Sequence, residues 1–176
     1  HMQTKPNYMP NTAKALEAIL WIVHRRPGFD IYHIVKAAYF ADKFHVSTYG
    51  RPICGETYSA GPYGPLPQVI YGLLKKDPIE LLALDGNGEV PFSVGARFGV
   101  TGSRGPNLNR LSKTDVEALA VGVEHVQHMT FDAIYNETHE DPAYVNADGS
   151  RIDYRDFIPN TDPQKSKKAE ALAETA

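Results

Sequence analysis

The segment from Asp30 to Val46 places the strongest constraint on the fold, because its apolar residues are spaced for a helix but cover most of its circumference. A helix that is apolar on most sides is buried within its domain. Asp30 supplies an oxygen for the helix N-cap. Small alanines along the segment should let a second helix approach closely. The apolar positions are Ile31, Ile34, Val35, Ala38, Tyr39, Phe40, Ala41 and Phe44.

The stretch from Tyr49 to Pro67 has a different character, with four glycines and four prolines among interleaved tyrosines. This composition predicts a long structured loop with one short extended piece from Ile53 to Tyr58. Asp42 is a charge in the otherwise apolar helix before this loop. We expect its carboxylate to accept hydrogen bonds from the loop or from a neighbouring tyrosine, so its removal should cost roughly 1–3 kcal/mol.

The remaining patterns predict a mostly α fold with a small β-hairpin or sheet, an α+β domain. Further helices are expected at 12–26, 66–76, from Ser112 onward, at 131–138 and after Asp153. Two or three short strands are expected between Ile79 and Thr101, with a hairpin turn at Asp85-Gly86-Asn87-Gly88. Residues 3–160 are expected to form one domain and 161–176 a polar, flexible tail. His1 and Met2 resemble the remnant of an expression tag.

Composition narrows the class of protein. The 176 residues include 42% hydrophobic and 22% charged residues, as in an ordinary globular domain. No apolar run approaches the ~20 residues of a membrane span, and the single cysteine, Cys54, suits a reducing cytoplasm. A net charge of −3 with scattered basic residues argues against nucleic acid as a partner. We therefore expect a soluble cytoplasmic protein.

No arrangement of reactive residues in the sequence predicts catalysis. His125 and His128 are three apart, a spacing that can hold a metal, but no cysteine pair or longer metal motif accompanies them. Cys54 is better interpreted as a small buried thiol than as a nucleophile. The carboxylates have no spacing that defines a general acid and base. The prediction is a protein without catalytic residues, metal or cofactor.

Several motifs follow one another in a fixed order, most of them within about forty residues. They are Lys36, Ala38-Tyr39-Phe40-Ala41-Asp42, Tyr49-Gly50-Arg51-Pro52-Ile53, Gly55-Glu56-Thr57-Tyr58, Tyr63-Gly64-Pro65-Leu66-Pro67 and the later His139 with Pro142-Ala143-Tyr144. In these motifs the chain resembles the Panacea domain of SocA-like antitoxins, and the likeness extends from about Leu16 to about Ile158. Ala37-Ala38 and Tyr144 depart from the bulkier residues usual there.

This resemblance implies a bacterial or phage antitoxin of a type II toxin–antitoxin system, which silences a co-encoded toxin by direct binding. Many such toxins block translation, and some family members instead deliver the toxin to a protease. A small hydrolase, a metal-dependent enzyme and a promoter-binding regulator are the alternatives, and the oligomeric state is left open. The structural signature implied by the resemblance is Tyr39, Phe40, Asp42, Gly50, Pro52, Gly55, Gly64, Pro65, Pro67 and His139.

A candidate surface for the toxin follows from the tyrosines. The chain has ten, and several gather around the glycine- and proline-rich loop. Tyrosine and arginine dominate interface hot spots because they bury a large area and keep a hydrogen-bonding end. The candidate partner-binding residues are Tyr49, Arg51, Tyr58, Tyr63 and Tyr71. For Tyr49 and Tyr58 the alternative is that they pack the loop onto the core, and the strand region at 79–101 is the next candidate surface.

Overall fold

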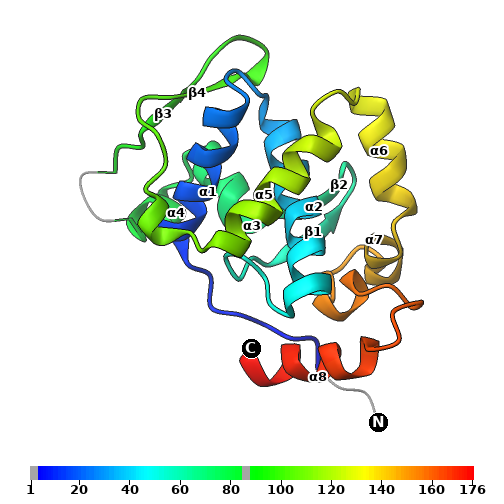
Figure 1. Cartoon of the computed structure of the whole chain (residues 1–176). Helices are drawn as coiled ribbons and strands as arrows, with labels where there is room; N and C mark the ends of the chain where they lie inside the picture. Colours follow the sequence, from blue (N-terminus) through cyan, green and yellow to red (C-terminus); the bar gives the residue numbers. More distant parts are fainter. Residues whose placement is uncertain (1–3, 85–87) are drawn as a thin grey trace.

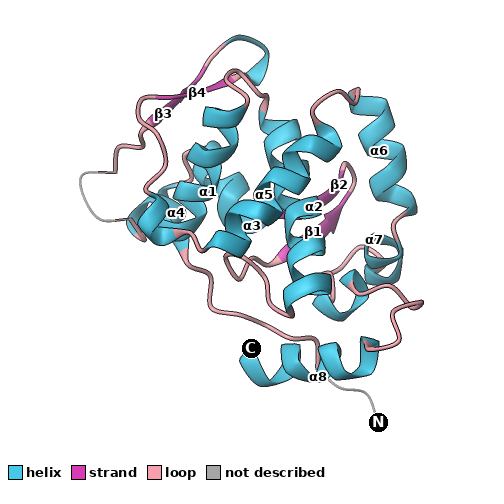
Figure 2. Ribbon diagram, viewed as in Figure 1, coloured by secondary structure: helices cyan, strands magenta, loops and turns pink. Residues whose placement is uncertain are grey.

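A computed structural model of the chain describes residues 4–84 and 88–176. Within these residues it contains eight α-helices and two separate antiparallel sheets of two strands each (Figures 1 and 2). The mostly α class with small β elements is therefore confirmed. The elements are α1 (Thr12–Arg25), α2 (Ile31–Tyr49), β1 (Tyr58–Gly61), β2 (Gly64–Pro67), α3 (Gln68–Leu74), α4 (Pro78–Leu82), β3 (Phe92–Val94), β4 (Val100–Gly102), α5 (Lys113–Val126), α6 (Phe131–Glu140), α7 (Pro142–Ala147) and α8 (Lys165–Thr175).

Helix α2 lies at the centre of the molecule and packs along α5 (Figure 1). Its N-cap is Asp30, whose side chain accepts from the backbone N–H of His33. It extends three residues beyond the predicted end, because Gly50 closes it in the left-handed conformation with φ 80°. Helix α5 begins with the expected capping box, in which Ser112 and Asp115 each bond the other's backbone N–H.

The glycine- and proline-rich stretch contains a β-hairpin. Strands β1 and β2 pair with Tyr58 opposite Pro67 and Gly61 opposite Gly64. The extended piece therefore begins at Tyr58, where we expected it to end. Leu66 and Pro67 belong to β2, so α3 begins two residues later than predicted. The hairpin forms here because Gly64, at φ 107°, accepts a backbone conformation that other residues avoid.

The prediction of strands from Ile79 onward is partly wrong. Asp77 caps a short helix, α4, whose first residue is Pro78, and the same Asp-Pro pair at Asp141 and Pro142 begins α7. Strands β3 and β4 do form, with Phe92 opposite Gly102. Their turn lies at residues 95–99. The turn predicted at Asp85-Gly86-Asn87-Gly88 cannot be compared, because residues 85–87 lie outside the described ranges.

The end of the chain contains a helix, where its polar composition predicts a flexible tail. Helix α8 lies beside the N-terminal segment (Figure 1) and buries Leu172 completely. The Tyr8 hydroxyl donates to the carbonyl of Leu172 at 2.9 Å. Lys168 Nζ donates to the carbonyl of Ser47 at 2.6 Å. One apolar residue and a few long-range hydrogen bonds thus hold a helix whose own sequence has only a weak apolar face.

Candidate functional site

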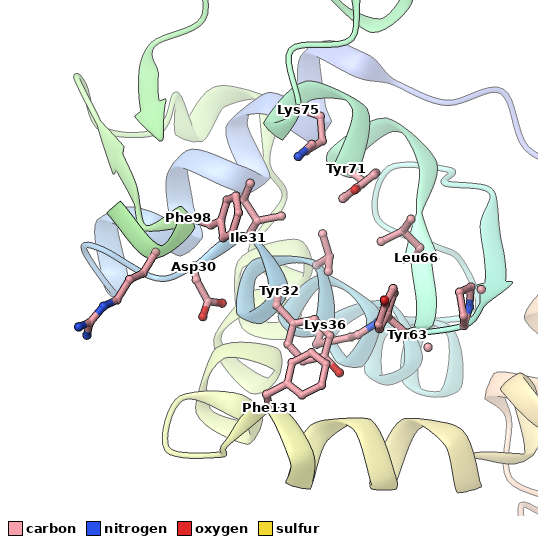
Figure 3. A pocket seen from close by; sticks show the side chains of 15 residues that line it. Asp30, Ile31, Tyr32, Lys36, Tyr63, Leu66, Tyr71, Lys75, Phe98 and Phe131 are labelled. Carbon is pink, nitrogen blue, oxygen red and sulfur yellow. The ribbon is translucent and has the colours of Figure 1, made fainter. Parts of the chain in front are cut away.

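The described surface contains an open pocket of about 430 Å³. It is bordered by the start of α2, the β1–β2 hairpin, α3, the β3–β4 turn and the start of α6, and Figure 3 shows side chains converging on it from these elements. Most of its lining is apolar. The aromatic residues of this lining are Tyr32, Tyr63, Tyr71, Phe98 and Phe131.

Three of these aromatic residues remain largely accessible. Tyr63 is 67% exposed, Phe98 is 63% exposed and Phe131 is 45% exposed. The ring of Tyr32 packs against that of Phe131, with centroids 4.3 Å apart and the ring planes tilted by 34°. Large apolar side chains that gather at one open concave site mark a place where another molecule binds. We call these pocket-lining residues and the elements that carry them the pocket face.

The charged residues of the pocket are mainly basic. Lys75 lies in the turn after α3 and Arg97 in the β3–β4 turn, while Lys36 is 1% exposed. Asp30 is the acidic residue in the lining, and its carboxylate is already paired with His33. The backbone N–H of His33 donates to this carboxylate at 2.7 Å, and the ring Nδ1 of His33 lies 2.8 Å from it. The side-chain hydrogen bond to Asp30 raises the pKa of His33. The charges that line the pocket therefore favour binding of an acidic group over a basic one.

The β3–β4 turn presents Phe98 in a strained backbone conformation. Arg97 has φ 54° and Phe98 has φ 60°, and the Gly99 N–H donates to the Ala96 carbonyl at 3.1 Å. Two successive positive φ angles define a type I′ turn, which normally takes Asn-Gly. Bulky residues in this conformation carry strain of order 1–3 kcal/mol each. Such strain often accompanies function, and here it holds an exposed aromatic ring at the pocket.

Replacing Arg97 and Phe98 together by Asn and Gly should therefore raise the free energy of unfolding by about 1–3 kcal/mol. The substitution suits the turn, and it removes an exposed ring that contributes little to the core. Chemical denaturation of both proteins measures the effect. If the double variant is less stable than the parent, the turn is not strained as described.

The signature residues implied by the resemblance are mostly structural. Asp42 is buried and accepts from the Ile53 N–H at 2.8 Å and the Tyr58 hydroxyl at 2.5 Å, so the prediction for its carboxylate is confirmed. His139 contacts the Pro62 carbonyl at 3.0 Å through Nε2. Gly50 ends α2, and Gly55 and Gly64 have positive φ. Besides Asp42, the buried members are Tyr39, Phe40, Pro52, Gly55, Gly64, Pro65 and Pro67.

The five predicted partner-binding residues do not form one surface. Tyr63 and Tyr71 line the pocket, whereas Tyr49 and Arg51 lie at the end of α2 against the start of α5. Tyr58 is 2% exposed, so its prediction as a partner contact is wrong. Its ring packs between core aromatic residues and its hydroxyl bonds Asp42. The alternative of packing onto the core is correct for this tyrosine.

Sequence reasoning missed most of the pocket. Tyr32, Phe98 and Phe131 were not singled out, and Lys36 was noted only as part of a motif. Tyr32 and Phe131 come from segments about a hundred positions apart and meet only in the folded chain. One local signal was present for Phe98, because a large aromatic residue between Gly95 and Gly99 is exposed in a tight turn.

The residues considered for catalysis are separated in the structure. Cys54 is buried, and burial raises the pKa of its thiol well above the usual range, which keeps it un-ionised. His125 Nε2 lies 2.5 Å from Glu137 on α6. Within the described ranges, no cluster of three or more histidine, cysteine or acidic side chains is placed to hold a metal. None of the helices described there has the length and hydropathy for a membrane span.

The fold and the pocket define a small helical domain with an open, mostly apolar pocket on its surface. The family model described as "Antitoxin SocA-like, Panacea domain" matches residues 34–144, and the chain belongs to this family. That membership implies an antitoxin role and a protein partner. The matched range contains α2 from Ile34 onward, both hairpins, α5 and α6, and so most of the pocket lining, but not Asp30, Ile31 or Tyr32. No curated protein and no solved structure matches the chain.

Proposed function

We propose that this chain is the antitoxin of a type II system, and that it neutralises a co-encoded toxin by covering it with the pocket face. The observation that carries the proposal is the open pocket with three accessible aromatic side chains in a chain of the antitoxin family. Aromatic anchors that fill or border a pocket contribute most of the energy of a protein interface. A stable complex should bury at least ~1,200 Å² in total, so the contact would extend beyond the pocket itself.

The aromatic side chains provide the test. Tyr63→Ala, Phe98→Ala and Phe131→Ala should each leave the fold intact, because all three rings are substantially exposed. Truncating a true anchor should weaken binding to the toxin from the neighbouring gene by about thirtyfold or more, or about 2 kcal/mol. Calorimetry measures the affinity, and rescue of growth on co-expression measures neutralisation.

Leu108→Ala is the matched control, because Leu108 is 58% exposed and does not line the pocket. It should change the affinity by less than about twofold. If all three aromatic variants bind the toxin as tightly as the parent, the pocket face is not the interface. Arg51→Ala and Tyr49→Ala would then test the surface at the end of α2.

The same co-expression separates direct covering from delivery to a protease. Covering predicts that the toxin accumulates in a stoichiometric complex with this chain. Delivery predicts that the toxin disappears while its transcript remains, and that it returns in a strain lacking the protease. Measuring toxin abundance beside growth therefore distinguishes the two mechanisms without further variants.

A further inference from the structure

The pocket contains a buried lysine with no acidic partner among the described residues. Lys36 Nζ donates to the Pro65 carbonyl at 2.7 Å, and none of the described ion pairs includes it. An ammonium group carries three N–H donors, so this single carbonyl leaves donor capacity unused. Gly64 makes room for it, since a Cβ there would lie 3.0 Å from Lys36 Nζ and 2.9 Å from Thr138 Oγ1. The chain thus places a cation where burial disfavours one.

A second buried polar group in the lining of the pocket is also unsatisfied. The Tyr32 hydroxyl is buried and has no hydrogen-bond partner among the described residues. The Lys36 ammonium lies 5.1 Å from the centre of the Tyr32 ring, and both residues line the pocket (Figure 3). Buried polar groups are normally hydrogen-bonded, so two neighbouring donors with unused capacity indicate an acceptor supplied from outside.

The neighbouring charges agree with an acidic ligand. Lys75 and Arg97 also line the pocket, while Asp30 is already engaged with His33. Asp132 on α6 is the other nearby acidic side chain, and burial first, then Tyr135, Asp30 and Asp132, raise the pKa of Tyr32 so that its hydroxyl stays protonated and able to donate. Burial lowers the pKa of Lys36 to about 7. A carboxylate beside it would favour the ammonium form again. Resting on the proposed function, we infer that the pocket receives an aspartate or glutamate side chain, flanked by a bulky apolar residue, from a segment of the partner protein.

The shape of the site favours binding of an internal segment of the partner protein over binding of the partner's chain terminus. The pocket is open and is lined from the β3–β4 turn on one side to the β1–β2 hairpin on the other (Figure 3). The aromatic rings would contact the apolar residue, while Lys36 and Tyr32 would donate to the neighbouring carboxylate. A charge-assisted hydrogen bond is about twice as strong as a neutral one, which makes the carboxylate the determinant of specificity.

Three short synthetic peptides test the inference directly. The first has blocked ends and a central Phe-Asp, the second replaces this Asp with Asn, and the third ends in Phe with a free carboxylate. Titration of the isotope-labelled full chain by NMR measures their affinities. We expect the Phe-Asp peptide to bind at least about tenfold more tightly than the Phe-Asn peptide, with shifts at pocket residues. Equal binding of these two peptides, or binding of the free-carboxylate peptide alone, would overturn the inference.

Two variants assign the effect to the named groups. Lys36→Met removes the ammonium but keeps an unbranched apolar chain of similar length, and it should abolish the preference for Asp over Asn. Tyr32→Phe removes only the hydroxyl and should weaken binding of the Phe-Asp peptide by about threefold or more. The Asp-to-Asn comparison on the parent protein needs no variant, so it decides the question even if Lys36→Met fails to fold.

The complex with the toxin keeps the two proposals separate. If the toxin binds the parent and a folded Lys36→Met variant equally well, direct neutralisation stands and the role of the acidic side chain is wrong. If the toxin does not bind the parent at all, the proposed function itself fails. Loss of binding in the Lys36→Met variant with an unchanged melting temperature supports both.

Discussion

Replacing Asp42 with alanine should lower the free energy of unfolding by about 2–5 kcal/mol, more than the sequence alone led us to expect. The carboxylate is 3% exposed and accepts two hydrogen bonds, from the Ile53 backbone N–H and the Tyr58 hydroxyl. Each stranded buried donor costs about 1–3 kcal/mol. In the variant the Tyr58 hydroxyl can still donate to the Ala38 carbonyl, 3.2 Å away. The loss of the Tyr58 bond to Asp42 therefore contributes less to the destabilisation than the loss of the Ile53 bond.

Urea denaturation of Asp42→Ala measures this loss, and two variants apportion it. Tyr58→Phe removes one donor together with its hydrogen bond, so it should lower the free energy of unfolding less than Asp42→Ala does. Asp42→Asn keeps one acceptor oxygen but turns an N–H₂ group toward one of the donors. The stability of Asp42→Asn should therefore lie between that of the parent and that of Asp42→Ala. An unchanged stability in Asp42→Ala would show that this carboxylate does not hold the loop to α2.

Replacing Gly122 with alanine should destabilise the protein by about 3 kcal/mol or more. A Cβ at this position of α5 would lie 2.1 Å from the carbonyl oxygen of Ala37 and 3.0 Å from the backbone N of Ala41. Both contacts are with the backbone of α2, which cannot rotate away as a side chain can. The two helices must move apart, and this overpacking outweighs the gain of about 1 kcal/mol in helix propensity.

Gly105 offers the matched control for this substitution. A Cβ there would meet no atom within 4 Å, and the residue has no positive φ. Gly105→Ala should change the free energy of unfolding by less than about 0.5 kcal/mol. Thermal and urea denaturation of both alanine variants measure the difference. Equal stability of Gly122→Ala and the parent would contradict the close approach of α2 and α5.

Both predictions concern the framework that holds the pocket in place. Asp42 fixes the segment that leads into the β1–β2 hairpin, and this hairpin carries Tyr63 and Gly64. Glu56 has a similar role in the same segment, because its buried carboxylate accepts the backbone N–H groups of Val69 and Ile70 at the start of α3. Buried carboxylates therefore position two walls of the pocket by pairing with loop and helix N–H groups that would otherwise be unsatisfied.

Much of the framework follows from short-range patterns in the sequence. The periodicity and the Asp30 cap predict α2, and Ser112 with Asp115 predicts the start of α5. An isolated carboxylate in an apolar helix next to a loop rich in unpaired N–H groups predicts the role of Asp42. These inferences succeed because a cap, an apolar face and a hydrogen-bond deficit depend on residues that are close in the chain.

The amino-acid sequence by itself therefore determined the central helix, the mostly α class, the acceptor role of Asp42 and, through its motifs, the antitoxin family. Only the tertiary structure decided that α8 is held through Leu172, that Tyr58 belongs to the core, and that Tyr32, Phe98 and Phe131 meet around one pocket. The physical reason is the range of the interactions. Packing between residues many positions apart depends on where whole elements dock, and no local pattern encodes that distance or direction.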